Sequence, residues 1–231
     1  MFPRFLVVLL FMISMIAQLS AQTKTYDTLP NVPDHYLKRY ALFKAEPVKT
    51  GAIVMLGNSI TEGGNWKKLL GDSAVLNRGI SGDVTFGVLN RLDEVLRHKP
   101  SKIFLLIGIN DLSRNTPDEV IIENLFTIAK RIKTASPKTE LFIQSILPTN
   151  ESFKNFPNAF RGKGPHITTI NNQLARYAEK MNYHFIDLYT QFLGTDGLMD
   201  AKYATDGLHL TALGYQHWVR ILRADSKVKL K

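Results

Sequence analysis

The chain contains no cysteine in its 231 residues. It therefore cannot form a disulfide bond, and it cannot carry a lipid on a cysteine at a signal cleavage site. The sequence also lacks a His-Glu-x-x-His motif, a cluster of metal ligands and a glycine-rich phosphate loop. We therefore expect neither a metal ion nor another cofactor. Internal repeats, low-complexity tracts and long linkers are absent too, and 45% of the residues are hydrophobic, which fits one globular domain with a full core.

Long apolar runs are confined to the N-terminus. Residues 1–21 hold a single charge, Arg4, then an apolar run over 5–17 and a small-residue ending at Ala21. This layout is typical of a secretory signal peptide cleaved after Ala21. The alternative is a membrane anchor, but the run is shorter than the roughly 20 residues that a span needs. We therefore expect an exported protein, periplasmic or secreted, with one domain over 22–231 and no integral membrane span after cleavage.

Acidic residues are in the minority. Lys and Arg number 29 against 20 Asp and Glu, a formal charge of +9, which becomes about +8 without Arg4. The cations are scattered, and their densest stretches, 130–133 and 227–231, are not interleaved with aromatic residues. A nucleic-acid stacking site would combine the two. We therefore expect a solvated basic surface and no nucleic-acid partner.

Apolar stretches of strand length alternate with amphipathic stretches of helix length. The expected strands are nearly continuous in apolar residues, as in a parallel sheet covered on both faces. Alternation of this kind predicts an α/β fold, a flavodoxin-like three-layer α/β/α sandwich around a five-stranded parallel sheet. We expect strands at 52–56, 74–77, 102–107, 140–146 and 184–188, helices at 34–46, 66–70, 84–98, 116–135, 167–181 and 211–225, and a long loop at 148–165.

Four short segments each carry one part of an acyl-transfer site. Ser59, Gly82 and Asn110 each follow one of the first three expected strands. The carboxyl ends of parallel strands share one edge of the sheet, so these residues are expected on the same rim. The fourth segment carries a histidine near the C-terminus. The segments are Gly57–Thr61, Gly79–Asp83, Gly108–Asp111 and Asp206–His209.

Ser59 and His209 are the candidate nucleophile and base. Asp206 precedes His209 by three residues, so a single helical turn would bring its carboxylate to the imidazole and fix the tautomer. A serine needs such a base to become nucleophilic. The alternatives are that Ser59 caps a helix and that Asp206 and His209 only form a local turn. The G-x-S-x-G elbow is absent, which disfavours the α/β-hydrolases.

The remaining histidines have no comparable setting. His35, His98, His184 and His217 are expected at the surface or in packing, with no carboxylate at the right spacing, and His166 at a helix start is uninformative.

An oxyanion would have three candidate donors: the N–H groups of Ser59 and Gly82 and the side-chain amide of Asn110. Fixed donors of this kind are worth about 3–4 kcal/mol each in acyl transfer. The alternatives are a tight turn at Gly82 and a turn asparagine at Asn110. Asp111 is expected to hold the loop.

The four segments together resemble the conserved blocks of the SGNH hydrolases, also called the GDSL esterase/lipase family. The resemblance covers about residues 50–220. Asn58 stands where the family usually has aspartate, a position outside the catalytic set. The resemblance implies attack by Ser59 on an ester, with His209 and Asp206 as base and acid and with Ser59, Gly82 and Asn110 as the oxyanion hole, without a metal.

The substrate is less constrained. Gly79–Asp83 and Asp206–Leu210 look similar to the acetylhydrolase branch that includes the platelet-activating-factor acetylhydrolase type. We therefore expect a small-molecule or glycan ester as partner, with an acetyl group on a carbohydrate favoured. The alternatives are a lysophospholipase or thioesterase acting on lipids, and a non-catalytic glycan-binding protein. Phe153, Phe156 and Phe160 either line a lipid groove or pack the long loop onto the body.

Overall fold

The computed structural model describes residues 32–230. The expected signal peptide and its cleavage site lie outside these residues. Within the described range, no helix combines the length and the apolar character that crossing a membrane requires.

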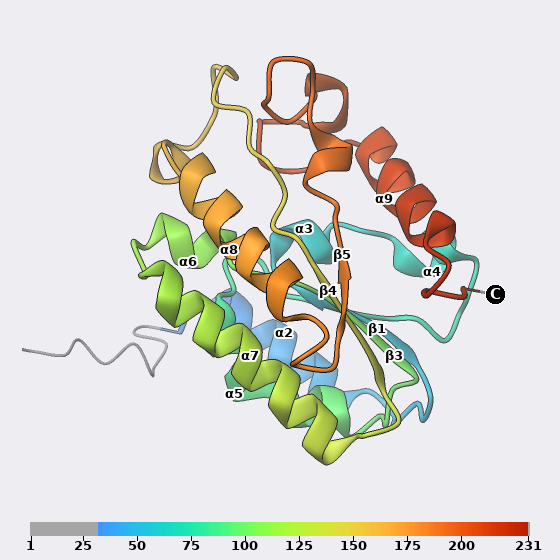
Figure 1. The fold of residues 1–231 in the computed structure, drawn as a ribbon. Coiled ribbons are helices and arrows are strands. Elements are labelled where there is room, and N and C mark those ends of the chain that lie inside the picture. Colours follow the sequence, from blue (N-terminus) through green and yellow to red (C-terminus); the bar gives the residue numbers. More distant parts are fainter. Residues whose placement is uncertain (1–31, 231) are drawn as a thin grey trace, which may run out of the picture.

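Five parallel strands form one sheet at the centre of the molecule (Figure 1). Their spatial order is β2-β1-β3-β4-β5, the flavodoxin-like order. In β1, β3 and β4, every residue except the first is buried, as expected for strands covered on both faces. The expected fold is therefore confirmed. The strands are β1 (Ile53–Gly57), β2 (Leu76–Gly79), β3 (Lys102–Leu106), β4 (Glu140–Gln144) and β5 (His184–Ile186).

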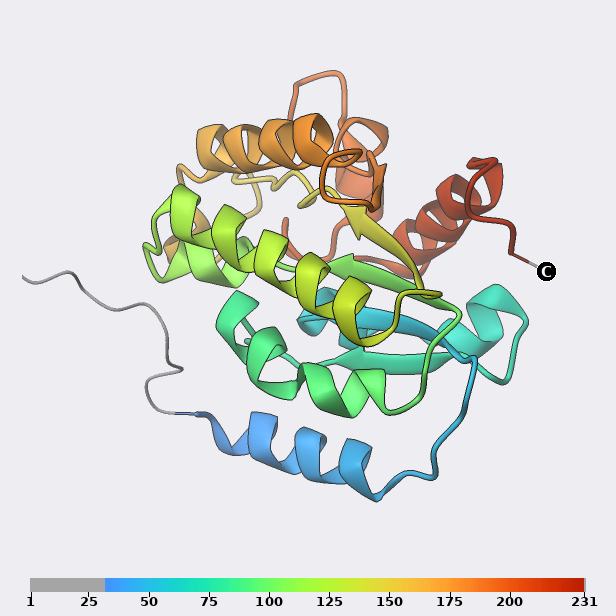
Figure 2. The same cartoon turned by 60° about the horizontal axis from the view of Figure 1, so that its bottom comes forward.

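Helices cover both faces of this sheet. One face carries α5 (Thr85–Leu96), α7 (Asp118–Ala135) and α8 (Gly164–Tyr177), with α7 packed against both neighbours. The other face carries α4 (Trp66–Leu70) and α9 (Ala212–Ala224), which contact each other. Figure 2 shows the two groups on either side of the strands. This arrangement places the loops after β1, β2 and β3 at one edge of the sheet.

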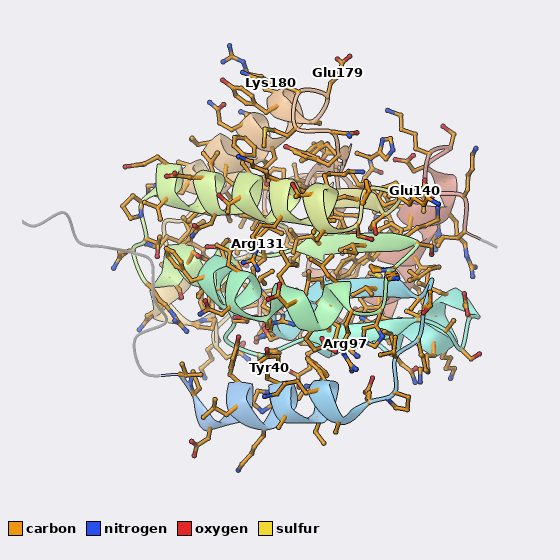
Figure 3. The ribbon with its side chains drawn as sticks, turned by 90° about the horizontal axis from the view of Figure 1, so that it is seen from below. Tyr40, Arg97, Arg131, Glu140, Glu179 and Lys180 are labelled. Atoms are coloured by element: carbon orange, nitrogen blue, oxygen red, sulfur yellow. The ribbon has the colours of Figure 1, made fainter. Side chains whose placement is uncertain are left out.

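The N-terminal helix α2 (Asp34–Ala45) lies outside this three-layer body. It contacts α5, and it packs on the loop after β2 through a small cluster formed by Tyr36, Phe43 and Ile80, with Tyr40 against it. Figure 3 shows Tyr40 between α2 and the rest of the molecule. Tyr36 also donates its hydroxyl hydrogen to the carbonyl of Gly87 at 2.9 Å, so α2 is attached by both apolar and polar contacts.

Two short helices were not expected from the sequence. These are α3 (Ser59–Glu62) and α6 (Ile109–Ser113), which begin immediately after the sheet rim. Each has about one turn, too short to show an apolar period. α8 also begins earlier than expected, at Gly164, because Pro165 suits the first turn of a helix. Short 3₁₀ turns lie at Asn158–Phe160, Thr190–Phe192 and Ala201–Tyr203.

The expectation that His98 has no carboxylate at the right spacing was wrong. His98 is fully buried, and its Nε2 lies 3.2 Å from Oε1 of Glu94, four residues earlier. That spacing brings two side chains together at a helix end. Arg78 of β2 completes the buried cluster, with its Nε 3.0 Å from Glu94. The cluster is therefore a structural ion network at the sheet edge.

Candidate active site

Ser59 lies at the point where β1 turns into α3. Asn58 is the N-cap residue of α3, and its side chain accepts a hydrogen bond of 3.0 Å from the Ile60 N–H. The alternative role of Ser59 as helix cap is therefore taken by Asn58. Ser59 is instead the first residue of α3, partly exposed at the rim. Its side chain is left available for another partner.

That partner is His209. The Ser59 Oγ lies 3.0 Å from His209 Nε2, although 150 residues separate them in the chain. On the other side of the imidazole, Nδ1 lies 2.8 Å from Oδ2 of Asp206. The structure therefore brings the three predicted residues into one line of hydrogen bonds. Both ends of the imidazole are occupied, so its orientation is defined.

Asp206 also accepts hydrogen bonds from the backbone of its own turn. Its Oδ1 accepts hydrogen bonds from the backbone N–H of His209 at 2.7 Å and of Leu208 at 3.0 Å. Burial acts to raise the pKa of Asp206, but these bonds and the contact with the imidazole outweigh it and lower the pKa. The carboxylate is therefore ionised at neutral pH. Gly207 completes the turn with a φ of +85°.

Gly82 and Asn110 come from neighbouring loops of the same rim. Gly82 has a φ of +78° in a turn closed by a 3.0 Å bond from the Asp83 N–H to the Ile80 carbonyl. Asn110, in the first turn of α6, donates one amide hydrogen to the Asp83 carbonyl at 2.9 Å. One Asn110 N–H is thus used to hold the side chain beside Gly82. Among residues 32–230, no acceptor is found for its other N–H or for the backbone N–H groups of Ser59 and Gly82.

Asp111 holds the neighbouring loop, as expected. Its side chain is fully buried and accepts hydrogen bonds from the Thr85 hydroxyl at 2.6 Å and from the Thr85 N–H at 3.1 Å. Burial raises the pKa of Asp111 to about 7, although these bonds oppose the shift and the nearby Asp83 adds to it. The Asp111 carboxyl therefore links α6 to the start of α5.

Two supporting residues were missed by sequence reasoning. Arg91 on α5 is fully buried, and its Nε forms a 2.9 Å ion pair with Asp83. Its Nη2 donates to the carbonyls of Gly57 and Arg78. Glu62, the last residue of α3, accepts hydrogen bonds from Ser81. Asp83 and Arg91 are eight residues apart in sequence, so no helical spacing reveals their pairing.

Within the described range, no three His, Asp or Glu residues gather as a metal site would require.

A family model built for the GDSL-like lipase/acylhydrolase family matches residues 55–217. The chain belongs to this family. The matched range includes all four segments of the rim, from Ser59 to His209, and it confirms the resemblance found in the sequence.

Relatives of this GDSL-like chain include an acetylhydrolase. The platelet-activating factor acetylhydrolase IB subunit alpha2 of Rattus norvegicus is 32% identical over 154 residues, which are 65% of this chain and 63% of the relative. The chain thus matches somewhat less than two thirds of that relative's length. A solved structure from Streptococcus pneumonia, whose name refers to platelet activating factor, is 30% identical with a TM-score of 0.74, covering 91% of this chain and 97% of the other.

A carbohydrate esterase shares the fold. The acetyl-xylooligosaccharide esterase from Geobacillus Stearmophilus has a TM-score of 0.62 at 19% identity, covering 80% of this chain and 98% of the other. At that identity the likeness establishes the fold alone.

The long loop of this GDSL-like chain packs inward. Phe156 is buried in the main core, and Phe153 and Phe160 are partly buried against it. Of the two readings of these phenylalanines, packing onto the body is therefore the one observed. The loop also supports the Asp206 turn, because the Asn150 N–H donates to the Gly207 carbonyl at 2.8 Å.

Proposed function

We propose that the protein is a serine esterase that removes small acyl groups from alcohol esters. The observation that carries this proposal is the continuous hydrogen-bonded line from Ser59 through His209 to Asp206, with distances of 3.0 and 2.8 Å. A nucleophile, a base within reach and a carboxylate that orients the base are the groups that acyl transfer requires.

The proposed reaction has two stages. In the first, Ser59 Oγ attacks the ester carbonyl while His209 Nε2 takes the hydroxyl proton, and the imidazolium then protonates the departing alcohol. In the second, His209 takes a proton from water as the water oxygen attacks the acyl-enzyme, and the imidazolium then returns that proton to the departing Ser59 Oγ, so that the acid is released and the serine hydroxyl is restored. Asp206 stays ionised and stabilises the imidazolium in both stages.

The oxyanion formed in each stage needs donors that are already in place. We assign this role to the N–H of Ser59, the N–H of Gly82 and the second amide hydrogen of Asn110. The support is that all three lie on one rim and that none of them has an acceptor among the described residues. Donors fixed in advance need no reorganisation when the charge develops.

The acyl group we favour is acetyl, carried on a carbohydrate. The relative with 32% identity is by name an acetylhydrolase. The inward packing of the loop phenylalanines also gives no support for a long acyl groove at that loop. The name of the same relative refers to platelet-activating factor, which keeps a lipid ester as the second candidate.

The test is hydrolysis of p-nitrophenyl acetate, butyrate and octanoate by the protein and by Ser59→Ala. We expect activity that falls with acyl length and disappears in the variant. Activity that rises with length would favour the lipid ester. A folded sample that neither turns over any ester nor reacts at Ser59 with a fluorophosphonate would favour a non-catalytic glycan-binding protein.

We also propose that residues 1–21 direct export and that residues 22–231 form a single catalytic domain. The support is the charge, apolar run and small-residue ending of this segment. N-terminal sequencing of the protein recovered from the periplasm or medium of a bacterial host tests this. A sequence beginning at Gln22 is expected, and an intact Met1 would contradict the proposal.

A further inference from the structure

A single carboxylate joins the serine helix to the glycine turn. Glu62 lies three residues after Ser59, at the end of α3. Its Oε2 accepts hydrogen bonds from the Ser81 N–H at 2.6 Å and from the Ser81 hydroxyl at 2.7 Å. Ser81 directly precedes Gly82, so these bonds restrain the residue before the peptide unit whose N–H is the proposed donor.

The backbones of the two segments are also in direct contact. A Cβ added at Gly79 would lie 2.2 Å from the Glu62 nitrogen and 2.6 Å from its Cα. The end of β2 therefore rests against the end of α3. Because no side chain separates the two segments there, a small movement of one is passed directly to the other.

Glu62 is held in turn by the N-terminal helix. His35 Nε2 lies 3.0 Å from Oε2, and Arg39 Nε lies 3.3 Å from Oε1. A second nitrogen of Arg39 donates to the Gly79 carbonyl at 3.1 Å. His35 and Arg39 come from α2, which lies outside the residues 55–217 that match the family model. The helix that Figure 2 shows outside the three layers thus reaches the rim.

The surroundings of Glu62 stabilise its ionised carboxylate. Burial acts to raise the pKa of Glu62, but hydrogen bonds from His35 and Ser81 and the charge of Arg39 outweigh it and lower the pKa. An ionised carboxylate can accept the two bonds from Ser81 and the contacts from α2 together. A neutral amide at this position would offer one acceptor oxygen and add two donors.

We propose that Glu62 is a positioning residue for the oxyanion hole. It fixes the Ser81 backbone and hydroxyl so that the Gly82 N–H and the Ser59 N–H point at the same oxyanion, and α2 holds it in place. This inference rests on the proposed esterase function. It assigns to Glu62 no contact with substrate.

The test compares Glu62→Gln with Glu46→Gln. Glu46 also joins α2 to the body, with its Oε2 2.9 Å from Arg78, but at the other end of the helix. The control therefore removes a carboxylate that also joins α2 to β2 but makes no hydrogen bond to Ser81 or Gly82. kcat and KM are measured on p-nitrophenyl acetate, and the concentration of active sites is counted by fluorophosphonate labelling of Ser59.

We expect Glu62→Gln to lower kcat per active site about tenfold. Complete loss of one oxyanion donor lowers kcat by about 10²–10³-fold, so the expected effect is smaller. KM should stay within about twofold, because the oxyanion exists only in the transition state. The rate of fluorophosphonate labelling should fall in parallel, because negative charge also develops on the phosphoryl oxygen as Ser59 attacks phosphorus and fluoride leaves. Glu46→Gln should stay within about twofold of the wild type in all three quantities, because Glu46 is 45% exposed and Glu94 still pairs with the Arg78 guanidinium.

A double-mutant cycle with Ser81→Ala separates positioning from general damage. If both residues act through one contact, the double variant should lose less than the product of the two single losses. Fully multiplicative losses would overturn the proposal. A kcat per active site equal to that of Glu46→Gln, or a change confined to KM, would overturn it too.

Ser59→Ala in the same assay keeps the two proposals distinct. If turnover persists in Ser59→Ala, the esterase mechanism itself is wrong. If turnover depends on Ser59 but Glu62→Gln leaves it unchanged, only the role of Glu62 is refuted.

Discussion

Replacing Asp206 by Asn would test the proposed triad with almost no change in shape. The amide oxygen can still accept from the backbone N–H groups of Leu208 and His209, which Oδ1 binds at 3.0 and 2.7 Å. The amide nitrogen then faces His209 Nδ1 in place of Oδ2. Because that nitrogen is a donor, it favours the tautomer with Nδ1 unprotonated and Nε2 protonated. In that tautomer Nε2 cannot accept the serine proton.

The expected size of the effect follows from the exposure of the pair. Where the triad aspartate is buried, the same change lowers kcat about 10⁴-fold. Here the side chains of His209 and Asp206 are 40% and 23% exposed, so water can partly replace the lost acceptor. We therefore expect a loss of about 10³-fold, or about 4 kcal/mol in the activation barrier.

The assay is kcat on p-nitrophenyl acetate, with the His209 tautomer read from its ring ¹⁵N chemical shifts. Asp118→Asn is the matched control, because Asp118 forms a 3.0 Å pair with His166 Nδ1 that has no part in the proposed chemistry. The control should keep the wild-type kcat. If Asp206→Asn retained more than about a tenth of kcat with the tautomer unchanged, the orienting role of Asp206 would be refuted.

Three further predictions follow from contacts around the rim. Asn110→Ala should lower kcat about 10²–10³-fold and leave a measurable remnant, because one of three donors is lost; full activity would refute the assignment of that donor. Gly207→Ala should lower the melting temperature and the activity together, since the φ of +85° costs about 1–2 kcal/mol for other residues and the added Cβ would lie 2.2 Å from the Asn150 carbonyl oxygen; an unchanged melting curve would contradict this. Asp111→Asn should gain stability relative to the wild type as pH rises from about 4 to 7. With a pKa of about 7 against 3.8 in the unfolded chain, the folded state holds a proton in that window that the unfolded state has lost, so the wild type becomes less stable as pH rises. Urea unfolding of both proteins at several pH values measures the difference, and parallel pH profiles would refute it.

The order of strands and helices could be predicted because each depends on local composition. The continuous apolar runs at β1, β3 and β4 correspond to strands buried on both faces. The helix α6 was missed because five residues show no periodicity, and a turn asparagine was accordingly one of the two interpretations of Asn110. The pairing of His98 with Glu94 was overlooked although its spacing of four residues is visible in the sequence.

The sequence by itself determined the alternating elements and the rim on which Ser59, Gly82 and Asn110 lie. It also determined the pairing of Asp206 with His209, because residues three positions apart meet within a single turn. Only the tertiary structure decided that His209 meets Ser59 across 150 residues and that Glu62 meets Ser81. A local contact depends on the backbone geometry of a few consecutive residues, and the side chains of those residues determine that geometry. A distant contact depends on the order of the strands and on the packing of every helix between them, so it is a property of the whole folded chain.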